Sequence, residues 1–185
     1  MQQILFLGDS LTAGYGLANS STESFPALIN EKIRSETLPY QIINAGLSGD
    51  TTSGGRSRID HWLTRQVDVF FLELGINDIR RGVAPGTIEL NLQAIINKVK
   101  AKYPDARLVL LGMEIPAFLG GQIAIEFSAI YRKLAEANHM ALVPFLLEGV
   151  AGKKHLNLWD RVHPSAAGYK IVADLVWPVL KSVLI

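Results

Sequence analysis

The chain has 185 residues, which favours one domain over residues 1–185 with a core large enough to fold alone. Hydrophobic residues make up 49% and charged residues 19%, a globular composition that argues against disorder. The 18 Lys and Arg nearly balance the 17 Asp and Glu, so the formal net charge is +1. The basic excess or stripe typical of a nucleic-acid binder is therefore missing, and no nucleic-acid partner is expected.

The composition also bears on where the protein works. No apolar run approaches the roughly 18 residues of a membrane span, and the first residues are too few and too strand-like for a signal peptide. The protein is expected to be cytoplasmic, or periplasmic or secreted if a signal peptide has been trimmed. The absence of cysteine excludes disulfide and thiolate chemistry and suits either compartment. The oligomeric state is not set by the sequence, which is compatible with a monomer.

The first part of the chain predicts a strand, a helix and a second strand. The apolar run at 3–8 is strand-like and ends at Gly8. A helix is predicted over 22–36, where apolar residues recur at helical spacing just after the capping-box sequence at 20–23. Residues 40–45 predict the second strand, and a polar, glycine-rich stretch follows it at 46–55.

The alternation continues to the end of the chain. The third strand, at 67–74, is almost continuously apolar, as expected when both faces of a strand are covered. The clearest helical periodicity lies at 87–102 and stops at Tyr103-Pro104-Asp105. The other predicted elements are a short helix at 56–64, a strand at 107–113, a loop containing Pro116, Gly120 and Gly121, a helix around 127–134, a strand at 140–144 and a helix at 165–183.

Five strands alternating with helices predict an α/β fold, in which helices cover both faces of a parallel sheet. Ligands of such open sheets bind outside the carboxyl ends of the strands. Ser10, Gly49 and Asn77 follow the first, second and third predicted strands, so they are expected at one edge of the sheet. His163, in the segment before the last helix, is expected to reach the same edge.

Ser10 is the candidate nucleophile, within Gly8-Asp9-Ser10-Leu11 directly after the first strand. A serine hydroxyl becomes a good nucleophile only when a base removes its proton. A turn at the end of a strand would expose both the hydroxyl and the backbone N–H of Ser10 to a bound carbonyl. The alternative for this residue alone is a turn or helix-cap serine, which is common after Gly-Asp.

His163 is the candidate base, because it alone of the 4 histidines has an acid placed to pair with it. Asp160 precedes it by three residues, and Pro164 disfavours a helical conformation at His163. Asp160 can then accept the Nδ1–H and stabilise the imidazolium. The alternative is a helix-entry aspartate beside an unrelated surface histidine. The remaining histidines are interpreted as structural or solvated: His61, His139 and His155.

Asn77 and Gly49 are candidate donors to an oxyanion. A tetrahedral intermediate needs donors fixed where its negative charge develops. The Asn77 amide can supply one, and the backbone N–H groups of Gly49 and Ser10 two more. Taken singly, Asn77 is better explained as a turn residue after a buried strand, and Gly49 as a plain loop glycine.

Together these elements resemble the SGNH hydrolases, also called the GDSL esterases/lipases. Four blocks of that family, in the family's order and across nearly the whole chain, are similar to Gly8-Asp9-Ser10-Leu11, Ser48-Gly49-Asp50-Thr51, Gly75-Ile76-Asn77-Asp78 and Asp160-Arg161-Val162-His163. Within the family the chain looks most like the bacterial thioesterase I/protease I/lysophospholipase L1 type and related arylesterases. Residues 44–51, 73–75 and 142–145 carry that closer likeness.

The resemblance implies a flavodoxin-like three-layer α/β/α sandwich with a five-stranded parallel sheet. It implies a serine esterase that needs no metal or other cofactor and acts on small-molecule esters, with short- to medium-chain acyl or aryl esters, thioesters or lysophospholipids as substrates. Ser10, Asp160 and His163 are implied to be catalytic and to work through an acyl-enzyme on Ser10. Ser10, Gly49 and Asn77 are implied to form the oxyanion hole.

Substrate contacts are expected beside these blocks and in residues 114–119, which look like the acyl-pocket loop of the subgroup. Two departures leave the acyl-chain preference open: Ile76 stands where the subgroup often has a small residue, and the residues of the loop differ. The expected substrate-binding residues are Asp9, Leu11, Ile76, Ile115, Pro116 and Phe118.

Other kinds of site find less support. The sequence has no Gly-x-Ser-x-Gly, no P-loop and no metal-ligand spacing, and Gly14-Tyr15-Gly16 lacks the third glycine of a dinucleotide site. Phosphate binding at the Gly8 turn is disfavoured by Asp9 and by the lack of basic residues there. Arg80-Arg81-Gly82 is either a lid segment or a solvated loop, and the loop is favoured.

Two rival functions use the same fold. A carbohydrate O-acetylesterase would have the same catalytic residues and differ only in its pocket, where the apolar residues at 115–119 favour an acyl or aryl group instead. A non-catalytic binding module would be expected to have lost at least one of Ser10, Asn77, Asp160 and His163, and all four are present.

Overall fold

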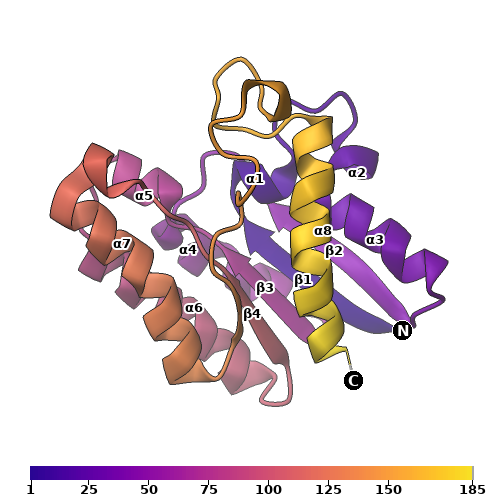
Figure 1. The fold of residues 1–185 in the computed structure, drawn as a ribbon. Coiled ribbons are helices and arrows are strands. Elements are labelled where there is room, and N and C mark those ends of the chain that lie inside the picture. The colour runs from indigo at the N-terminus through magenta and orange to yellow at the C-terminus, as the bar shows by residue number, and fades with distance from the viewer. Residues whose placement is uncertain (185) are drawn as a thin grey trace.

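The computed structural model describes residues 1–184, in which a parallel five-stranded sheet lies between two layers of helices (Figure 1). The strand order is β2-β1-β3-β4-β5, which is the flavodoxin-like order, so the predicted α/β fold is confirmed. Each neighbouring pair is parallel. The strands are β1 (Gln2–Gly8), β2 (Tyr40–Gly46), β3 (Val69–Glu73), β4 (Arg107–Leu111) and β5 (Ala141–Val143).

Two sets of helices cover the sheet (Figure 1). One face carries α4 (Thr52–Trp62), α6 (Pro85–Lys102) and α7 (Ala117–Asn138), and the other carries α3 (Phe25–Ser35) and α8 (Ala166–Val183). The central strands are buried on both sides, which explains their continuous apolar sequence. Across residues 1–184, every helix is too short or too polar to span a bilayer.

The aromatic core lies between β1 and β3. Phe6 stacks on Phe71 with ring centroids 4.3 Å apart, and Phe25 of α3 meets Phe6 edge-on at 5.6 Å. All three rings are almost completely buried. This packing fixes the two strands whose carboxyl ends carry the candidate site.

Short helices that were not predicted gather near the carboxyl ends of the strands. They are α1 (Ser10–Ala13), α5 (Ile76–Arg80) and a 3₁₀ turn, η1 (Lys154–Leu156), together with α2 (Ser20–Glu23), which overlaps the start of the helix predicted at 22–36. α1 begins two residues after β1, where the Asp9 side chain accepts the Leu11 N–H at 2.9 Å. Ser10 and Asn77 therefore lie in the first turns of helices.

The predicted helix at 22–36 is wrong at its start, because the chain breaks at Ser24. Ser24 is extended, and its hydroxyl caps α3 by accepting the Ala27 N–H. The capping interaction expected at 20–23 belongs to Asn19 instead: Asn19 caps α2, and Glu23 accepts the Asn19 N–H at 2.9 Å. One predicted helix is thus two.

The segment after β4 also differs from the prediction. The expected loop around 116–121 is partly helical, since α7 begins at residue 117. Gly121, with φ 53 and ψ −134, interrupts it. A side chain at this φ would be strained, so glycine allows the helix to bend here. The short piece before the bend lies beside the carboxyl edge of the sheet (Figure 1).

Candidate active site

Ser10, His163 and Asp160 form one hydrogen-bonded chain at the carboxyl edge of the sheet. Ser10 Oγ lies 2.9 Å from His163 Nε2, and His163 Nδ1 lies 2.6 Å from Asp160 Oδ2. When Nδ1 carries the proton and donates it to Asp160, Nε2 is left to accept from the Ser10 hydroxyl. Such an arrangement can remove the hydroxyl proton as the oxygen attacks a carbonyl.

The turn before α8 is built around the Asp160 carboxylate. Its Oδ1 accepts the backbone N–H groups of Val162 and His163, at 2.9 and 3.0 Å. Partial burial acts to raise the pKa of Asp160, but the hydrogen bonds from the His163 ring and from the two backbone groups outweigh it and lower the pKa to about 2. Asp160 is therefore ionised at neutral pH.

Tyr15 packs against the His163 ring, a contact that the sequence did not reveal. The two ring centroids are 4.7 Å apart, and Tyr15 is half-exposed. The glycines on either side of Tyr15 are in the left-handed region, with φ 79 and 77. A Cβ on Gly16 would lie 2.3 Å from Leu158 Cδ1, so Gly16 packs closely against that side chain. The Gly14-Tyr15-Gly16 sequence, which failed as a dinucleotide signal, thus holds a ring beside the histidine.

The candidate oxyanion donors meet beside Ser10. Asn77 Nδ2 donates to Asp9 Oδ2 and to the Asp50 carbonyl, both at 2.9 Å, and so ties the segment after β3 to those after β1 and β2. Gly49 is left-handed, with φ 79, and its carbonyl accepts from Arg81 Nη2 at 2.9 Å. Within residues 1–184, the backbone N–H groups of Ser10 and Gly49 make no hydrogen bond to protein.

Asp9 lies beneath Ser10 as a buried support. Its own N–H donates to Glu73 Oε2 at 3.0 Å, and the Thr12 hydroxyl donates to the same oxygen at 2.9 Å. Burial raises the pKa of Asp9 to about 6. Burial, and then the neighbouring Asp9 charge, raise the pKa of Glu73 well above its usual range. Asp9 is fully buried and does not line the cavity described below.

Arg58 fixes the segment that carries Gly49. Its Nε contacts Asp50 Oδ2 at 2.7 Å, and its other nitrogens donate to the carbonyls of Ala45 and Gly8, at 2.7 and 3.0 Å. One guanidinium therefore joins the ends of β1 and β2. Nothing local in the sequence singled out this residue, because its partners lie up to 50 positions away.

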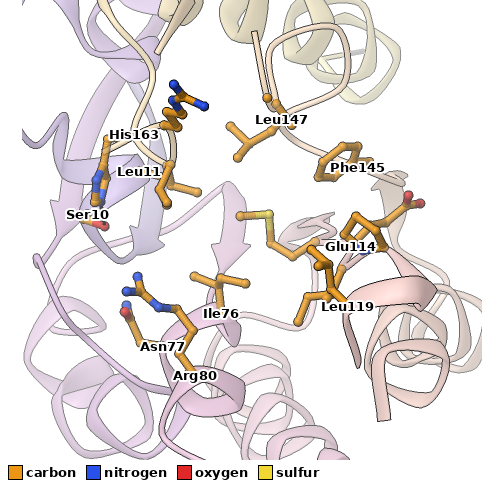
Figure 2. A pocket seen from close by; sticks show the side chains of 17 residues that line it. Ser10, Leu11, Ile76, Asn77, Arg80, Glu114, Leu119, Phe145, Leu147 and His163 are labelled. Atoms are coloured by element: carbon orange, nitrogen blue, oxygen red, sulfur yellow. Dashed lines mark hydrogen bonds between the residues drawn. The ribbon is translucent and has the colours of Figure 1, made fainter. Parts of the chain in front are cut away.

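Ser10 opens onto a cavity of about 630 Å³. Figure 2 shows Ser10, His163 and Asn77 at one end of it, with Phe145 and Leu119 at the other. Of the expected substrate-binding residues, four line this cavity: Leu11, Ile76, Ile115 and Pro116. Phe118 is 88% exposed and lies outside the lining, where its neighbour Leu119 takes part.

Further lining residues came from segments that carry no local signal of a pocket. Met113, Phe145 and Leu147 add apolar surface, and they come from the chain after β4 and β5. Arg80, Glu114 and Arg161 add charge. Among residues 1–184, no three His, Asp or Glu side chains are grouped as metal ligands would be.

Comparison with known proteins places the chain in a family. Residues 6–171 match the GDSL-like Lipase/Acylhydrolase family. The chain belongs to this family. The resemblance drawn from the four sequence blocks is thereby confirmed, and this GDSL-like chain is a hydrolase of the carboxylic ester class.

Several family members are similar over most of their length. "Esterase TesA" of Pseudomonas aeruginosa is 36% identical over 184 residues, which cover 99% of this chain and 90% of that protein. "Thioesterase 1/protease 1/lysophospholipase L1" of Escherichia coli (strain K12) is 38% identical over 172 residues, 92% of this chain and 79% of that one. The crystal structure of the psychrotrophic esterase EstA from Pseudoalteromonas sp. matches with a TM-score of 0.90 at 30% identity, covering 98% of each chain.

Proposed function

We propose that this GDSL-like hydrolase cleaves short- to medium-chain acyl or aryl esters through an acyl-enzyme on Ser10. The observation that carries the proposal is the unbroken chain of contacts from Asp160 through His163 to Ser10, which ends at an apolar cavity. The apolar lining suits an acyl chain, whereas a carbohydrate O-acetylesterase would need polar groups for its sugar. Because the relatives are named esterase, thioesterase and lysophospholipase, thioesters and lysophospholipids stand as alternative substrates.

The first half of the proposed reaction acylates Ser10. His163 Nε2 takes the hydroxyl proton while Oγ bonds to the acyl carbon, and the carbonyl electrons move to oxygen. The resulting oxyanion accepts the backbone N–H groups of Ser10 and Gly49 and one hydrogen of the Asn77 amide. When the tetrahedral intermediate collapses, the bond to the leaving oxygen breaks, and the imidazolium gives that oxygen its proton.

The second half releases the acid. A water molecule gives a proton to His163 as it attacks the acyl carbon, and collapse of this intermediate returns the proton to Ser10 Oγ. The Asp160 carboxylate remains ionised throughout and balances the imidazolium of each half-reaction, in keeping with the low pKa of Asp160. The free acid then leaves the cavity.

Hydrolysis of p-nitrophenyl acetate, butyrate and octanoate by wild type and by Ser10→Ala tests the proposal. Loss of the nucleophile is expected to lower kcat by about 10⁴-fold or more. Ser57→Ala, at an exposed serine of α4, is the matched control and should keep wild-type turnover. Circular dichroism checks that each variant is folded.

A covalent probe tests the same assignment without a substrate. The Pseudoalteromonas structure is described as inhibited by monoethylphosphonate. A reactive monoethyl phosphonate should add one phosphonyl group to the wild type and to Ser57→Ala, and none to Ser10→Ala, as read by mass spectrometry. Unchanged turnover and labelling in Ser10→Ala would refute the role of Ser10.

A further inference from the structure

Two arginines line the cavity without a part in the hydrolysis described above. Arg80 is the last residue of α5, and Figure 2 shows its guanidinium beside Asn77, on the Ser10 side of the cavity. Arg161 lies two residues before His163, in the turn around Asp160, and lines the same cavity. Within residues 1–184, neither guanidinium is paired with an acidic side chain.

The acidic groups near the cavity are held by other residues or lie away from the two arginines. Glu114 is the one acid in the lining among the described residues, and Figure 2 shows its carboxylate at the far end, away from Ser10. Asp160 is paired with His163, and Asp9 is buried beneath Ser10. At the reacting end, the guanidinium groups of Arg80 and Arg161 are therefore the charges without an ion-pair partner among the described residues, and the opposite end is lined mainly by apolar side chains.

The backbone conformation of Arg161 also favours a functional role for its guanidinium group. Arg161 has φ 58, a left-handed conformation that an arginine rarely adopts and that glycine or asparagine would adopt more readily. A third guanidinium, that of Arg81, holds the Gly49 carbonyl next to the candidate oxyanion donors.

We propose that Arg80 and Arg161 form a subsite for an anion on the leaving group, so that the enzyme prefers esters whose alcohol carries a phosphate or carboxylate close to the scissile bond. This inference rests on the proposed function. The far end of the cavity is mainly apolar and its one acid, Glu114, would repel an anion, so an anion is better placed on the alcohol part. Guanidinium groups suit both anions, since each presents oxygens that accept charge-assisted hydrogen bonds.

The test compares three butyryl esters that differ in the charge on the same phenol. The alcohols are methyl 4-hydroxybenzoate, 4-hydroxybenzoate and 4-hydroxyphenyl phosphate, and each kcat/KM is divided by the hydroxide rate of that ester to remove intrinsic reactivity. The quantity compared is the ratio of corrected kcat/KM for an anionic ester to that for the neutral ester. Because both arginines are exposed, each is expected to raise this ratio about threefold, or about tenfold together. Sodium chloride at about 1 M should reduce the ratio by screening.

Variants assign the preference to the two side chains. Arg80→Gln and Arg161→Gln should each lower the ratio about threefold, and the corresponding Lys variants should keep most of it because they retain the charge. Arg132→Gln, at an exposed arginine of α7 outside the cavity, is the matched control and should keep the wild-type ratio. The ratio is insensitive to a general loss of activity, so a damaged fold does not imitate the expected result.

Each outcome separates this inference from the proposed function. Equal corrected rates for all three esters, with turnover that depends on Ser10, would overturn the anion subsite and leave the hydrolase intact. A preference that survives both Gln substitutions would overturn the assignment to Arg80 and Arg161. No Ser10-dependent turnover of any ester would overturn the proposed function itself. A higher ratio for the phosphate than for the benzoate supports a phosphate monoester as the source of the anion, and equal ratios support either anion.

Discussion

Two acids buried beneath Ser10, Asp9 and Glu73, make the stability of the protein depend on pH. Burial raises the pKa of Asp9 to about 6, whereas an unfolded aspartate titrates near 3.9. Between these values the folded protein holds a proton that the unfolded chain has lost. Linkage then requires the free energy of unfolding to fall as the pH rises through this interval. The raised pKa of Glu73 acts in the same direction.

Asp9→Asn should flatten this dependence. The wild type is expected to lose up to about 3 kcal/mol of unfolding free energy between about pH 4 and about pH 7 through Asp9, and the variant should lose less, because only the contribution of Glu73 remains. Urea unfolding at several pH values measures the difference. Asp105→Asn, at an exposed loop position, controls for the loss of one acid and should behave as the wild type. An unchanged slope in Asp9→Asn would contradict the burial argument.

Single residues also show which parts of the site were readable from sequence. Asp160 and His163 lie three positions apart, so their pairing leaves a local pattern that predicted the contact, which is 2.6 Å long in the structure. Glu73 and Arg58 act on partners 64 and 50 positions away, and no local pattern reports such contacts. Tyr15 reaches His163 only because two left-handed glycines turn the chain.

The bend in α7 matters at the scale of elements. Gly121 separates a short first piece, which brings Leu119 to the cavity, from the long piece that packs on the sheet. Gly121→Ala would put a side chain at φ 53 and is expected to cost about 1–2 kcal/mol if the bend is kept. The helix should relieve this strain by shifting the piece that carries Leu119.

The expected result for Gly121→Ala is a lower kcat/KM for p-nitrophenyl octanoate relative to acetate, since the long acyl chain loses a wall. Gly86→Ala on α6 is the control: it has no positive φ, and an added Cβ there meets nothing within 4 Å. A chain-length ratio equal to that of the wild type in Gly121→Ala would show that the bend does not shape the acyl end.

Elements were predicted where a periodic pattern had room to appear. The five strands and the helix predicted at 87–102 were found, whereas α1 and α5, of 4 and 5 residues, are too short for a period. α4 begins at Thr52, whereas the prediction placed its start at 56. The prediction began late because Gly54 and Gly55 suggested a loop. A Cβ on Gly55 would lie 2.4 Å from Leu74, so this glycine is needed for the helix to pack on the sheet.

The strand order assembles the site at the scale of the whole molecule. β1 lies between β2 and β3, so the segments that carry Ser10, Gly49 and Asn77 leave the sheet side by side. The general rule for parallel sheets was enough to predict a shared edge. It was not enough to predict the cavity, because Phe145 and Leu147 come from the chain after β5, whose approach depends on tertiary packing.

Removing an aromatic ring between β1 and β3 should lower the stability of the protein without changing the kcat of the folded molecules. Phe71→Ala loses the fully buried ring stacked on Phe6 and is expected to lower the free energy of unfolding by about 3–5 kcal/mol. The kcat of the folded fraction should stay close to that of the wild type, because the ring lies inside the sheet. Leu90→Ala, at a side chain 72% exposed, should change stability by less than about 0.5 kcal/mol. Urea unfolding with parallel kinetics checks both, and a kcat that falls with stability would contradict this separation.

The hydrogen bonds of Asn77 have a consequence for selectivity between ground state and transition state. Both amide hydrogens are already held, one by the Asp9 carboxylate and one by the Asp50 carbonyl. On the proposed mechanism, a neutral ester carbonyl is a weaker acceptor than that carboxylate and gains little from the amide, whereas a full oxyanion can compete for it. The Asn77 amide should therefore hydrogen-bond the oxyanion of the intermediate but not the carbonyl of the bound substrate. This difference favours turnover over tight substrate binding.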